Sequence, residues 1–541
     1  MKFDQPPQSI LRRRWISLAA IIAAGILFAV LKFNGARIDQ TLWGEDGTIF
    51  INQARELRFS SLWATYAGYF HLYPRLIAWL STFLDLQITP LIFLSAWFLA
   101  YVALIYVAAS RALLCEFNPA GVGLLVILML AQPHLGEVFF TLTNAQWFIG
   151  GALAIYVLVP TKDRSSIYEK GMLLVASLTG PFALVLSPIL LMHLVIYKDW
   201  DDRKYVYILI GSGALAQCAA ILLSNRLTGG NFDENVMHWV RAIFNFMSFG
   251  STSDVSLAAS LLFWTTAAYA FVVNIGKNLN RHYATTGVVT LSLLAGAMFF
   301  YGAGVLAVKS HLHWLSPLGY EARYFFIPYL LVFFAAWLVV LRQPKLRFLF
   351  YVALTILAIS SFTMYKRNDL QFKAYAEFSR IKSDVFIPLE PQLEDFPSWH
   401  IHLPENSDRL NRKSVDAISL NLEDAKMLNI MGSDEKHQKN GFISLNEDPQ
   451  ISFDIGERCR HASYLGVEIH ITRPDDGWVQ LYWSESEKYL EHQSLRRYYP
   501  AGDAAVQFAL PMKNVKYLRF DPLEKRSQLQ INAVRLYCLG D

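Results

Sequence analysis

The sequence is poor in cysteine and nearly balanced in charge. Four cysteines among 541 residues are too few for a disulfide framework, and they form no cysteine-rich zinc motif. The net charge of +4 is small for this length and does not indicate a nucleic-acid partner. There is also no phosphate-binding loop, dinucleotide fingerprint or nucleophile elbow. Any energy for its activity would therefore come from an ion gradient or an activated substrate.

Apolar residues dominate the first two thirds of the chain. Hydrophobic residues make up 54% and aromatic residues 14% of the sequence, and the long apolar runs end near Tyr365. The remaining residues are much richer in charge. This distribution predicts a polytopic α-helical membrane protein over residues 1–365, followed by a soluble region. Arg12–Arg14 precede an apolar run that is long enough to span and lacks an obvious cleavage site, so we expect a retained first helix.

Loop charge and run length predict about eleven transmembrane helices, with the N-terminus in the cytoplasm and the C-terminal region outside. Residues 34–87 form a large outer loop, in which Tyr73–Leu84 is too short to span and is expected to lie on the membrane. Carboxylates and lysines are scarce in mid-span, which argues against a proton-coupled transporter. The predicted spans are Trp15–Phe33, Ile88–Ser110, Gly121–Ala131, Ala145–Leu158, a hairpin broken at Thr179-Gly180-Pro181 within Gly171–Tyr197, Val206–Leu223, Val255–Ile275, Thr286–Val308, Tyr324–Leu341 and Phe348–Tyr365.

The soluble region divides into an extended, proline-containing lead-in over residues 366–440 and a domain over 441–541. Short alternating runs separated by turn residues predict an antiparallel β-sandwich in that domain. Cys459 and Cys538 lie near its early and final strands, so either a disulfide or two buried thiols fits the pattern, and we favour the bridge. Trp478 and Trp483 have opposite parity on one strand, so one should be buried and the other exposed.

The stretch Trp43–Ala54 follows the first apolar run and carries two adjacent acids, Glu45 and Asp46. Carboxylates here are stable only if they face water or a polar cavity. Gly44 and Gly47 flank them and allow a tight turn or close backbone approach, and the pattern becomes helical from Thr48. The pair is either part of a catalytic site or a simple acidic helix start, which the helix dipole also favours.

Further polar residues gather in the predicted outer loops. Carboxylates there could act as general bases on a hydroxyl group, and arginines could hold a phosphate through two hydrogen bonds. Ordinary anchoring at the membrane surface is the alternative for each single residue. His134 and Glu137 would form half of a divalent-metal site if their segment were helical. Besides Glu45 and Asp46, the candidates are His71, Tyr73, Arg75, His134, Glu137, Asn144, Arg226, Asp233, Glu234, Lys309, His311, His313, Tyr320, Glu321 and Arg323.

Three features together resemble the GT-C glycosyltransferases, which use polyprenyl-phosphate sugars on the outer face of a membrane. They are the first-loop acids, Tyr73-Pro74-Arg75 before an interfacial helix, and Ala322-Arg323-Tyr324-Phe325 opening a late span. Phe50 also matches the aromatic residue that follows the family's acid by four positions, if that acid is Asp46. The second outer loop departs from the family, because its nearest acid is Glu137. The segments 476–483 and 518–522 resemble galactose-binding-like sandwiches.

The resemblance implies a bacterial inner-membrane transferase, similar to O-antigen glucosyltransferases, with a periplasmic C-terminal domain. It would move a sugar such as glucose from undecaprenyl phosphate to a lipopolysaccharide or other surface glycan. The anomeric carbon would be inverted if attack is direct and single-step. Asp46 would be the base, with Glu45 as the alternate. Arg75 and Arg323, then Lys309 and Arg226, would bind donor phosphate, and His134, Glu137, Asn144, Tyr320 and Glu321 would form an acceptor or second acidic site. No cofactor is required, although a divalent metal fits. A lipid-linked glycan transporter and a polysaccharide polymerase or ligase are the alternatives.

Overall fold

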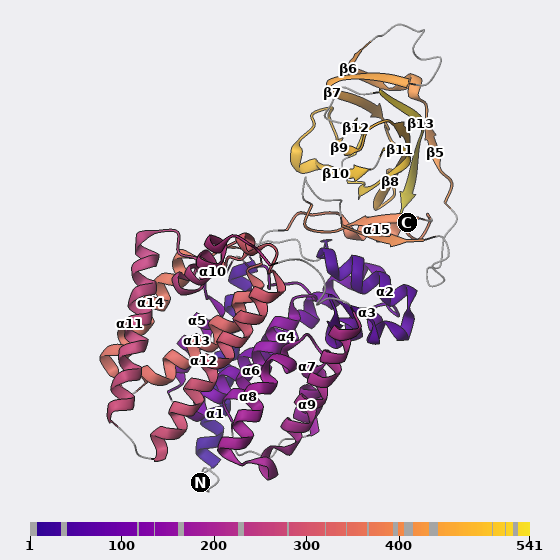
Figure 1. Cartoon of the computed structure of the whole chain (residues 1–541). Helices are drawn as coiled ribbons and strands as arrows, with labels where there is room; N and C mark the ends of the chain where they lie inside the picture. Colours follow the sequence, from indigo (N-terminus) through magenta and orange to yellow (C-terminus); the bar gives the residue numbers. More distant parts are fainter. Residues whose placement is uncertain are drawn as a thin grey trace. The chain divides into compact units, whose positions relative to one another are not determined.

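The structure is a computed structural model, and it divides the chain into two compact units. It describes residues 8–33, 40–115, 118–134, 136–160, 167–224, 232–277, 281–319, 321–341, 343–364, 367–382, 384–392, 399–404, 415–431, 442–499, 501–513, 515–522 and 528–540. Unit 1 comprises residues 1–36, 59–77 and 93–366, and unit 2 comprises residues 37–58, 78–92 and 367–541. Figure 1 shows helices in the first unit and strands in most of the second.

Unit 1 is a bundle of apolar helices. Its most buried member is α13, in which every residue from Phe325 to Val340 is buried, so this helix forms the centre of the bundle. Short elements β1, β2 and α3 precede the long helices, and α3 and α4 extend across the boundaries between the units. The elements are α1 (Gln8–Phe33), η3 (Arg58–Trp63), β1 (Thr65–Tyr66), β2 (Tyr69–Phe70), α3 (Leu72–Ser81), α4 (Thr89–Cys115), α5 (Pro119–Leu130), α6 (Ala145–Leu158), α7 (Ile167–Ser177), α8 (Phe182–Tyr197), α9 (Trp200–Leu223), α10 (Val236–Ser248), α11 (Asp254–Lys277), α12 (Arg281–Ala307), η6 (Leu312–Trp314), α13 (Arg323–Val340) and α14 (Pro344–Ser360).

Six helices among the described residues are long and apolar enough to cross a membrane. Each predicted span coincides with a helix, but α5, α6 and α8 are shorter apolar helices, so the number of spans stays a prediction. The short helix predicted over Tyr73–Leu84 is present as α3, which has ten residues, and its position on the membrane surface stays a prediction. The six segments are Arg13–Phe33, Leu86–Cys115, Trp200–Leu223, Asp254–Val273, Gly287–Ala307 and Arg323–Val340.

The predicted break in the fifth apolar run is confirmed. Helix α7 ends at Ser177 and α8 begins at Phe182, so residues 178–181 are irregular. Their backbone groups are nevertheless satisfied, because Gly180 donates to the Phe70 carbonyl at 2.9 Å and the Leu178 carbonyl accepts from Leu72 at 3.1 Å. Irregular backbone within an apolar bundle requires such partners.

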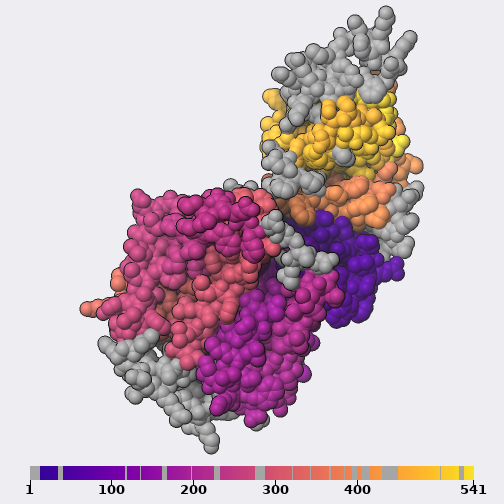
Figure 2. Space-filling view, in the orientation of Figure 1, coloured from indigo at the N-terminus to yellow at the C-terminus, as the bar shows by residue number. Residues whose placement is uncertain are grey.

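Unit 2 joins part of the first predicted outer loop to the C-terminal region. The Thr48 hydroxyl donates to the His400 carbonyl at 3.1 Å, and the Glu390 amide donates to the Leu42 carbonyl at 2.9 Å. In Figure 2 the indigo residues of this unit lie against its orange ones. The helical elements of unit 2 are η2 (Asp46–Ile51), α2 (Asn52–Glu56), η4 (Leu86–Ile88), α15 (Phe372–Phe378), η7 (Leu422–Asp424) and η8 (Glu491–Gln493).

The strands of unit 2 pair antiparallel, as the sequence predicts. The main sheet has the order β10-β9-β12-β7-β13-β8-β11, with β5 added to β13 and β6 added to β7. The long strands β7 and β13 pair with each other and with the strands on either side. The strands are β3 (Val385–Pro388), β4 (His400–Leu403), β5 (Ile418–Leu420), β6 (Lys426–Met431), β7 (Phe442–Asp454), β8 (Tyr464–Arg473), β9 (Gly477–Ser484), β10 (Ser494–Tyr499), β11 (Gly502–Pro511), β12 (Tyr517–Asp521) and β13 (Gln528–Leu539).

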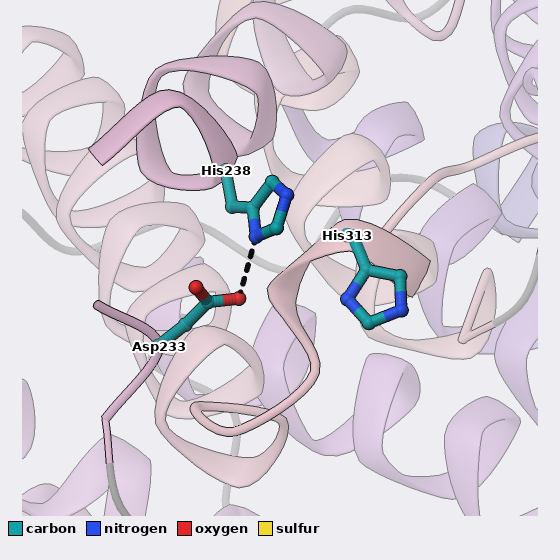
Figure 3. Close-up of side chains that lie close together, drawn as sticks. All are labelled: Asp233, His238 and His313. Atoms are coloured by element: carbon teal, nitrogen blue, oxygen red, sulfur yellow. Dashed lines mark hydrogen bonds and ion pairs between the residues drawn. The ribbon is translucent and has the colours of Figure 1, made fainter. Parts of the chain in front are cut away.

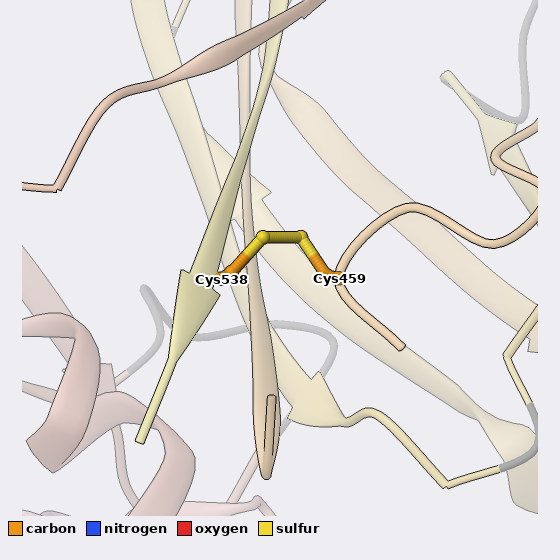
Figure 4. The surroundings of a disulfide bond; sticks show 2 residues. All are labelled: Cys459 and Cys538. Atoms are coloured by element: carbon orange, nitrogen blue, oxygen red, sulfur yellow. A yellow bond between two sulfur atoms is a disulfide. The ribbon is translucent and has the colours of Figure 1, made fainter. Parts of the chain in front are cut away.

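One side-chain prediction in unit 2 is confirmed, and another is confirmed in part, because the second tryptophan is half-buried rather than exposed. Cys459 and Cys538 form a disulfide, with their Cα atoms 5.1 Å apart, which ties a turn after β7 to the end of β13 (Figure 4). Trp483 is 6% exposed, whereas Trp478 on the opposite face of β9 is half-buried. Strands β3 to β6 lie within residues 385–431, where the sequence predicts an extended lead-in; the domain limits at 365 and 441 stay a prediction.

Candidate functional site

An arginine held between two carboxylates forms the main polar cluster of unit 1. Arg323 contacts Glu137 at 2.7 Å through one terminal nitrogen and Glu321 at 2.7 Å through the other. Its backbone amide also donates to Glu137 at 3.3 Å. The three side chains are 18–27% exposed, so the cluster is accessible to solvent. Two sequence-predicted acids and one predicted phosphate-binding residue are therefore brought together.

The start of α13 positions this cluster. Arg323 is the first residue of the helix, and its amide is one of the N-terminal N–H groups that have no partner within a helix. The Glu137 carboxylate accepts from this amide, and the positive end of the helix dipole favours the negative charge. Glu321 lies two residues earlier with a φ of 59°, a left-handed conformation that is uncommon for a non-glycine residue. The chain thus holds Glu321 in a strained backbone geometry beside the arginine.

The loop between α5 and α6 supplies the other side of the cluster. The Asn144 side-chain amide donates to the Glu137 carbonyl at 2.9 Å, which fixes the backbone of this acid next to the N-terminus of α6. His134 is 2% exposed, and its Nδ1 accepts the Gly136 amide at 2.8 Å. The neutral imidazole therefore carries its proton on Nε2. Asn144 and His134 support the loop that presents Glu137.

Burial shifts the pKa values of Glu321 and His134 in opposite directions. Burial raises the pKa of Glu321 above its ordinary value; the neighbouring Glu137 charge also raises it, while Arg323 acts to lower it. Burial, with the charge of Lys32, lowers the pKa of His134 to about 3. His134 is therefore neutral near pH 7. Glu321 is a stronger base than an ordinary glutamate, which is the property required for general acid–base chemistry.

The first-loop acids lie in unit 2. Asp46 begins η2 and is 1% exposed, and Glu45 directly before it is half-buried. The flanking glycines allow close packing, because a Cβ at Gly44 would come within 2.6 Å of Trp399 and one at Gly47 within 2.4 Å of Leu389. The close approach that the sequence predicts is thus to side chains of the same unit.

The predicted phosphate-binding residues lie on different elements. Arg75 is in α3 and 1% exposed, and burial lowers its pKa to about 10, so it remains charged at neutral pH. Lys309 is half-buried, with its ammonium 5.1 Å from the centre of the Phe232 ring. Arg226 and Tyr320 lie outside the described residues.

The helix on which a shared metal site at His134 and Glu137 would depend is not formed by the described residues of this segment. Their segment is a loop that turns at Gly136 with a φ of 97°. The imidazole Nδ1 accepts a backbone hydrogen bond and Glu137 pairs with Arg323, so both groups have other roles. Among the described residues, the group with ligand atoms close enough to share a metal is Asp233, His238 and His313. Of these, His238 was not predicted from the sequence, although its spacing of five residues from Asp233 could have indicated a shared site.

An apolar cleft of about 520 Å³ lies between α4, α6 and α7. Along α4 its lining extends from Leu99 to Leu114, a length of about 22 Å at the helical rise per residue. Tyr73 and Arg111 also line it. Helix α6 connects the cleft to the cluster, because Ile149 and Tyr156 line the cleft while the N-terminus of the helix follows Asn144.

Within the described residues, the chain combines six helices long and apolar enough to span a membrane, an antiparallel β region and a partly exposed acid–arginine cluster. The sequence matches no family model and no curated protein. Among solved structures it is similar to the cryo-EM structure of arabinosyltransferase EmbB from Mycobacterium smegmatis, at 11% identity and a TM-score of 0.26. The match covers 100% of this chain and 65% of that chain. A likeness of this size carries no argument about fold or activity.

Proposed function

We propose that the protein is a membrane glycosyltransferase that moves a sugar from a polyprenyl-phosphate donor to a glycan acceptor. The observation that carries the proposal is the cluster of Glu137, Glu321 and Arg323, which places an accessible carboxylate of raised pKa beside a second acid. Pairs of acids in different environments are typical of general acid–base sites. The sequence resemblance to GT-C enzymes supports the same reaction class.

The reaction requires little more than a base and a leaving group. An acceptor hydroxyl attacks the anomeric carbon, its proton passes to a carboxylate, and the bond to phosphate breaks with the electron pair leaving on polyprenyl phosphate. Glu321 is the acceptor of that proton in our proposal, and Arg323 positions it against Glu137. Asp46, with Glu45 as its alternate, is the competing base that the family resemblance supports.

The apolar cleft supports a lipid-linked donor. Its length of about 22 Å along α4 suits an extended hydrocarbon chain, and its lining is largely aliphatic and aromatic. Donor phosphate would be held by basic residues, of which Arg75 is the strongest candidate because Arg323 already contacts two carboxylates. An activated donor also fits a sequence without a nucleotide-binding motif.

We also propose on which side of the membrane unit 2 lies. Basic loops predict a cytoplasmic N-terminus and a periplasmic unit 2 in a bacterial inner membrane. The disulfide of unit 2 supports that location, because disulfides persist in oxidising compartments. Alkaline phosphatase fused after Tyr365 should therefore be active. A cytoplasmic reporter that is active at this junction would contradict the orientation.

Donor cleavage distinguishes a transferase from a transporter. The full chain in liposomes would be supplied with undecaprenyl-phosphate glucose and a purified O-antigen glycan. We expect glucose to become covalently attached to the glycan and undecaprenyl phosphate to be released. Movement of intact donor between leaflets without cleavage would support the transporter that the sequence leaves open and would overturn the proposal.

A further inference from the structure

Two histidines and an aspartate from separate segments meet beside α10. Asp233 precedes this helix, His238 lies in its first turn, and His313 belongs to η6 in the α12–α13 connection. One ligand atom from each residue lies within 4.8 Å of the others. Figure 3 shows the two imidazole rings beside the Asp233 carboxylate, with the His238–Asp233 hydrogen bond of 2.7 Å drawn between them.

Asp233 is fixed by contacts that do not involve the histidines. Its backbone amide donates to the Lys309 carbonyl at 2.7 Å, and its own carbonyl accepts the Trp239 indole N–H at 2.9 Å. The carboxylate Oδ1 accepts the Asn235 amide at 3.0 Å. These bonds orient Oδ2 toward His238. Ligand oxygens that are held in this way require little rearrangement when a metal binds.

The segment that carries His313 is also anchored. Leu312 is 1% exposed, and the His311 ring stacks on Trp314 with centroids 4.7 Å apart. The Asn245 side-chain amide of α10 donates to the Leu315 carbonyl at 2.9 Å. The His313 ring is thereby kept near His238, with ring centroids 5.4 Å apart.

An aspartate–histidine hydrogen bond alone would explain only two of these residues. It leaves no role for the second imidazole beside the same carboxylate. A carboxylate oxygen and two imidazole nitrogens that converge in this way are donor atoms of the kind found in metal sites.

The donor set identifies the class of ion. Two imidazole nitrogens with one carboxylate suit zinc and similar divalent transition metals, whereas magnesium and calcium prefer oxygen ligands alone. Ligand bonds of about 2.0–2.2 Å in a tetrahedron require donor atoms about 3.3–3.5 Å apart. The 2.7 Å contact between Asp233 and His238 would open slightly, and His313 would move closer. The exposed side of His313 leaves room for water as the fourth ligand.

We propose that Asp233, His238 and His313 bind one divalent transition-metal ion of the zinc type. The ion joins the N-terminus of α10 to η6. Helix α10 has a largely exposed apolar face that includes Val236, Val240 and Ile243. Hydrogen bonds from other helices reach the carbonyls of its C-terminal half, from Ala242 to Met247, and a metal would anchor its N-terminus. The site is independent of the proposed transferase reaction.

Cobalt provides a direct test because tetrahedral cobalt absorbs visible light. The full chain, purified in detergent without a histidine tag, would be titrated with Co²⁺. We expect one ion per chain, displaced by Zn²⁺, and at least a tenfold loss of affinity in His238→Ala and His313→Ala. The control is His492→Ala, an exposed histidine of η8 in unit 2, which should bind as the wild type does.

A second variant keeps the test valid if an alanine variant is unstable. Asp233→Asn retains an oxygen that can accept from His238 but loses the charge, so it should fold and bind Co²⁺ at least tenfold more weakly. Circular dichroism of each variant checks folding. The proposal is overturned if the wild type binds no Co²⁺, or if folded His313→Ala and Asp233→Asn bind it as tightly as the wild type.

Discussion

Glu321 of unit 1 and Glu468 of unit 2 differ in exposure and in the direction in which their pKa values are shifted. Glu321 in unit 1 is 21% exposed, and burial raises its pKa. Glu468 in unit 2 is 1% exposed; burial acts to raise its pKa, but hydrogen bonds from His470 and Lys382 outweigh burial and lower it. Asp46 is as deeply buried as Glu468. An acid that reacts must be accessible and able to take a proton, whereas a buried, paired acid stabilises a fold.

The first prediction concerns turnover by the unit 1 acids. Glu321→Gln removes the proposed base and keeps the size of the side chain, so we expect sugar transfer to fall by about 10²–10⁴-fold. Sugar transfer by Glu137→Gln should fall less, because this acid positions Arg323. Asp254→Asn, an exposed acid at the start of α11, is the control and should leave transfer unchanged. Normal transfer by folded Glu321→Gln would show that Glu321 is not the base, so that it would no longer differ in role from the buried acids of unit 2.

The second prediction concerns the stability of unit 2. Glu468→Gln should lower the free energy of unfolding by about 1–3 kcal/mol, because Lys382, His470 and Arg535 lose a charged partner. These partners are partly exposed, which limits the loss. Thermal unfolding of the full chain followed by a unit 2 signal measures it. Lys426→Gln, which removes an exposed ion pair with Glu487, is the control.

The lowered pKa of Glu468 also predicts that the stability of unit 2 depends on pH. The pKa of Glu468 is lower in the folded than in the unfolded state, so its contribution is complete above the ordinary glutamate pKa of about 4.3 and is lost as pH falls through the folded value. Wild-type unit 2 should therefore lose stability on acidification below about pH 5, and Glu468→Gln should lose less. Equal acid sensitivity in the two proteins would contradict this assignment.

The third prediction separates positioning from phosphate binding at Arg323. Arg323 opposes the raised pKa of Glu321, so Arg323→Gln should raise that pKa further and move the acid limb of the pH–rate profile to higher pH. We expect about a tenfold loss in kcat, with the donor KM little changed. Arg323→Lys should restore much of the profile because it keeps the charge. A large rise in donor KM without a pH shift would instead identify a phosphate-binding residue.

The smallest effect is expected at Asp46. If this acid mainly stabilises the start of η2, Asp46→Asn should lower stability by about 0.3–2 kcal/mol and leave transfer within a few-fold of the wild type. Thermal unfolding and transfer would be measured on one preparation. Abolished transfer in a folded Asp46→Asn protein would restore the role that the family resemblance gives this residue.

Local features of the fold could be predicted from the sequence. Hydropathy locates the long apolar helices, Thr179-Gly180-Pro181 locates the break, and alternating runs locate six of the seven strands from β7 to β13. Strand β10 was not predicted, because Ser494–Tyr499 contains two arginines and lacks a clear apolar alternation. Those arginines differ in the fold, since Arg497 is buried and hydrogen-bonds Tyr375, a contact that no local pattern encodes.

Contacts between distant segments could not be predicted. Glu137 and Arg323 are 186 residues apart, and the sequence assigns them to separate roles, as an acceptor-site acid and a phosphate ligand. Their pairing depends on how α6 packs against α13. The association of Thr48 with His400 likewise depends on tertiary packing, which places the first-loop acids in unit 2.

The central claim is tested most directly by donor cleavage in matched variants. Release of undecaprenyl phosphate from undecaprenyl-phosphate glucose would be measured in one membrane preparation each of wild type, Asp46→Asn and Glu321→Gln, at equal amounts of folded protein. We expect release by the wild type and Asp46→Asn and almost none by Glu321→Gln. Loss of release in Asp46→Asn with full release in Glu321→Gln would contradict the account.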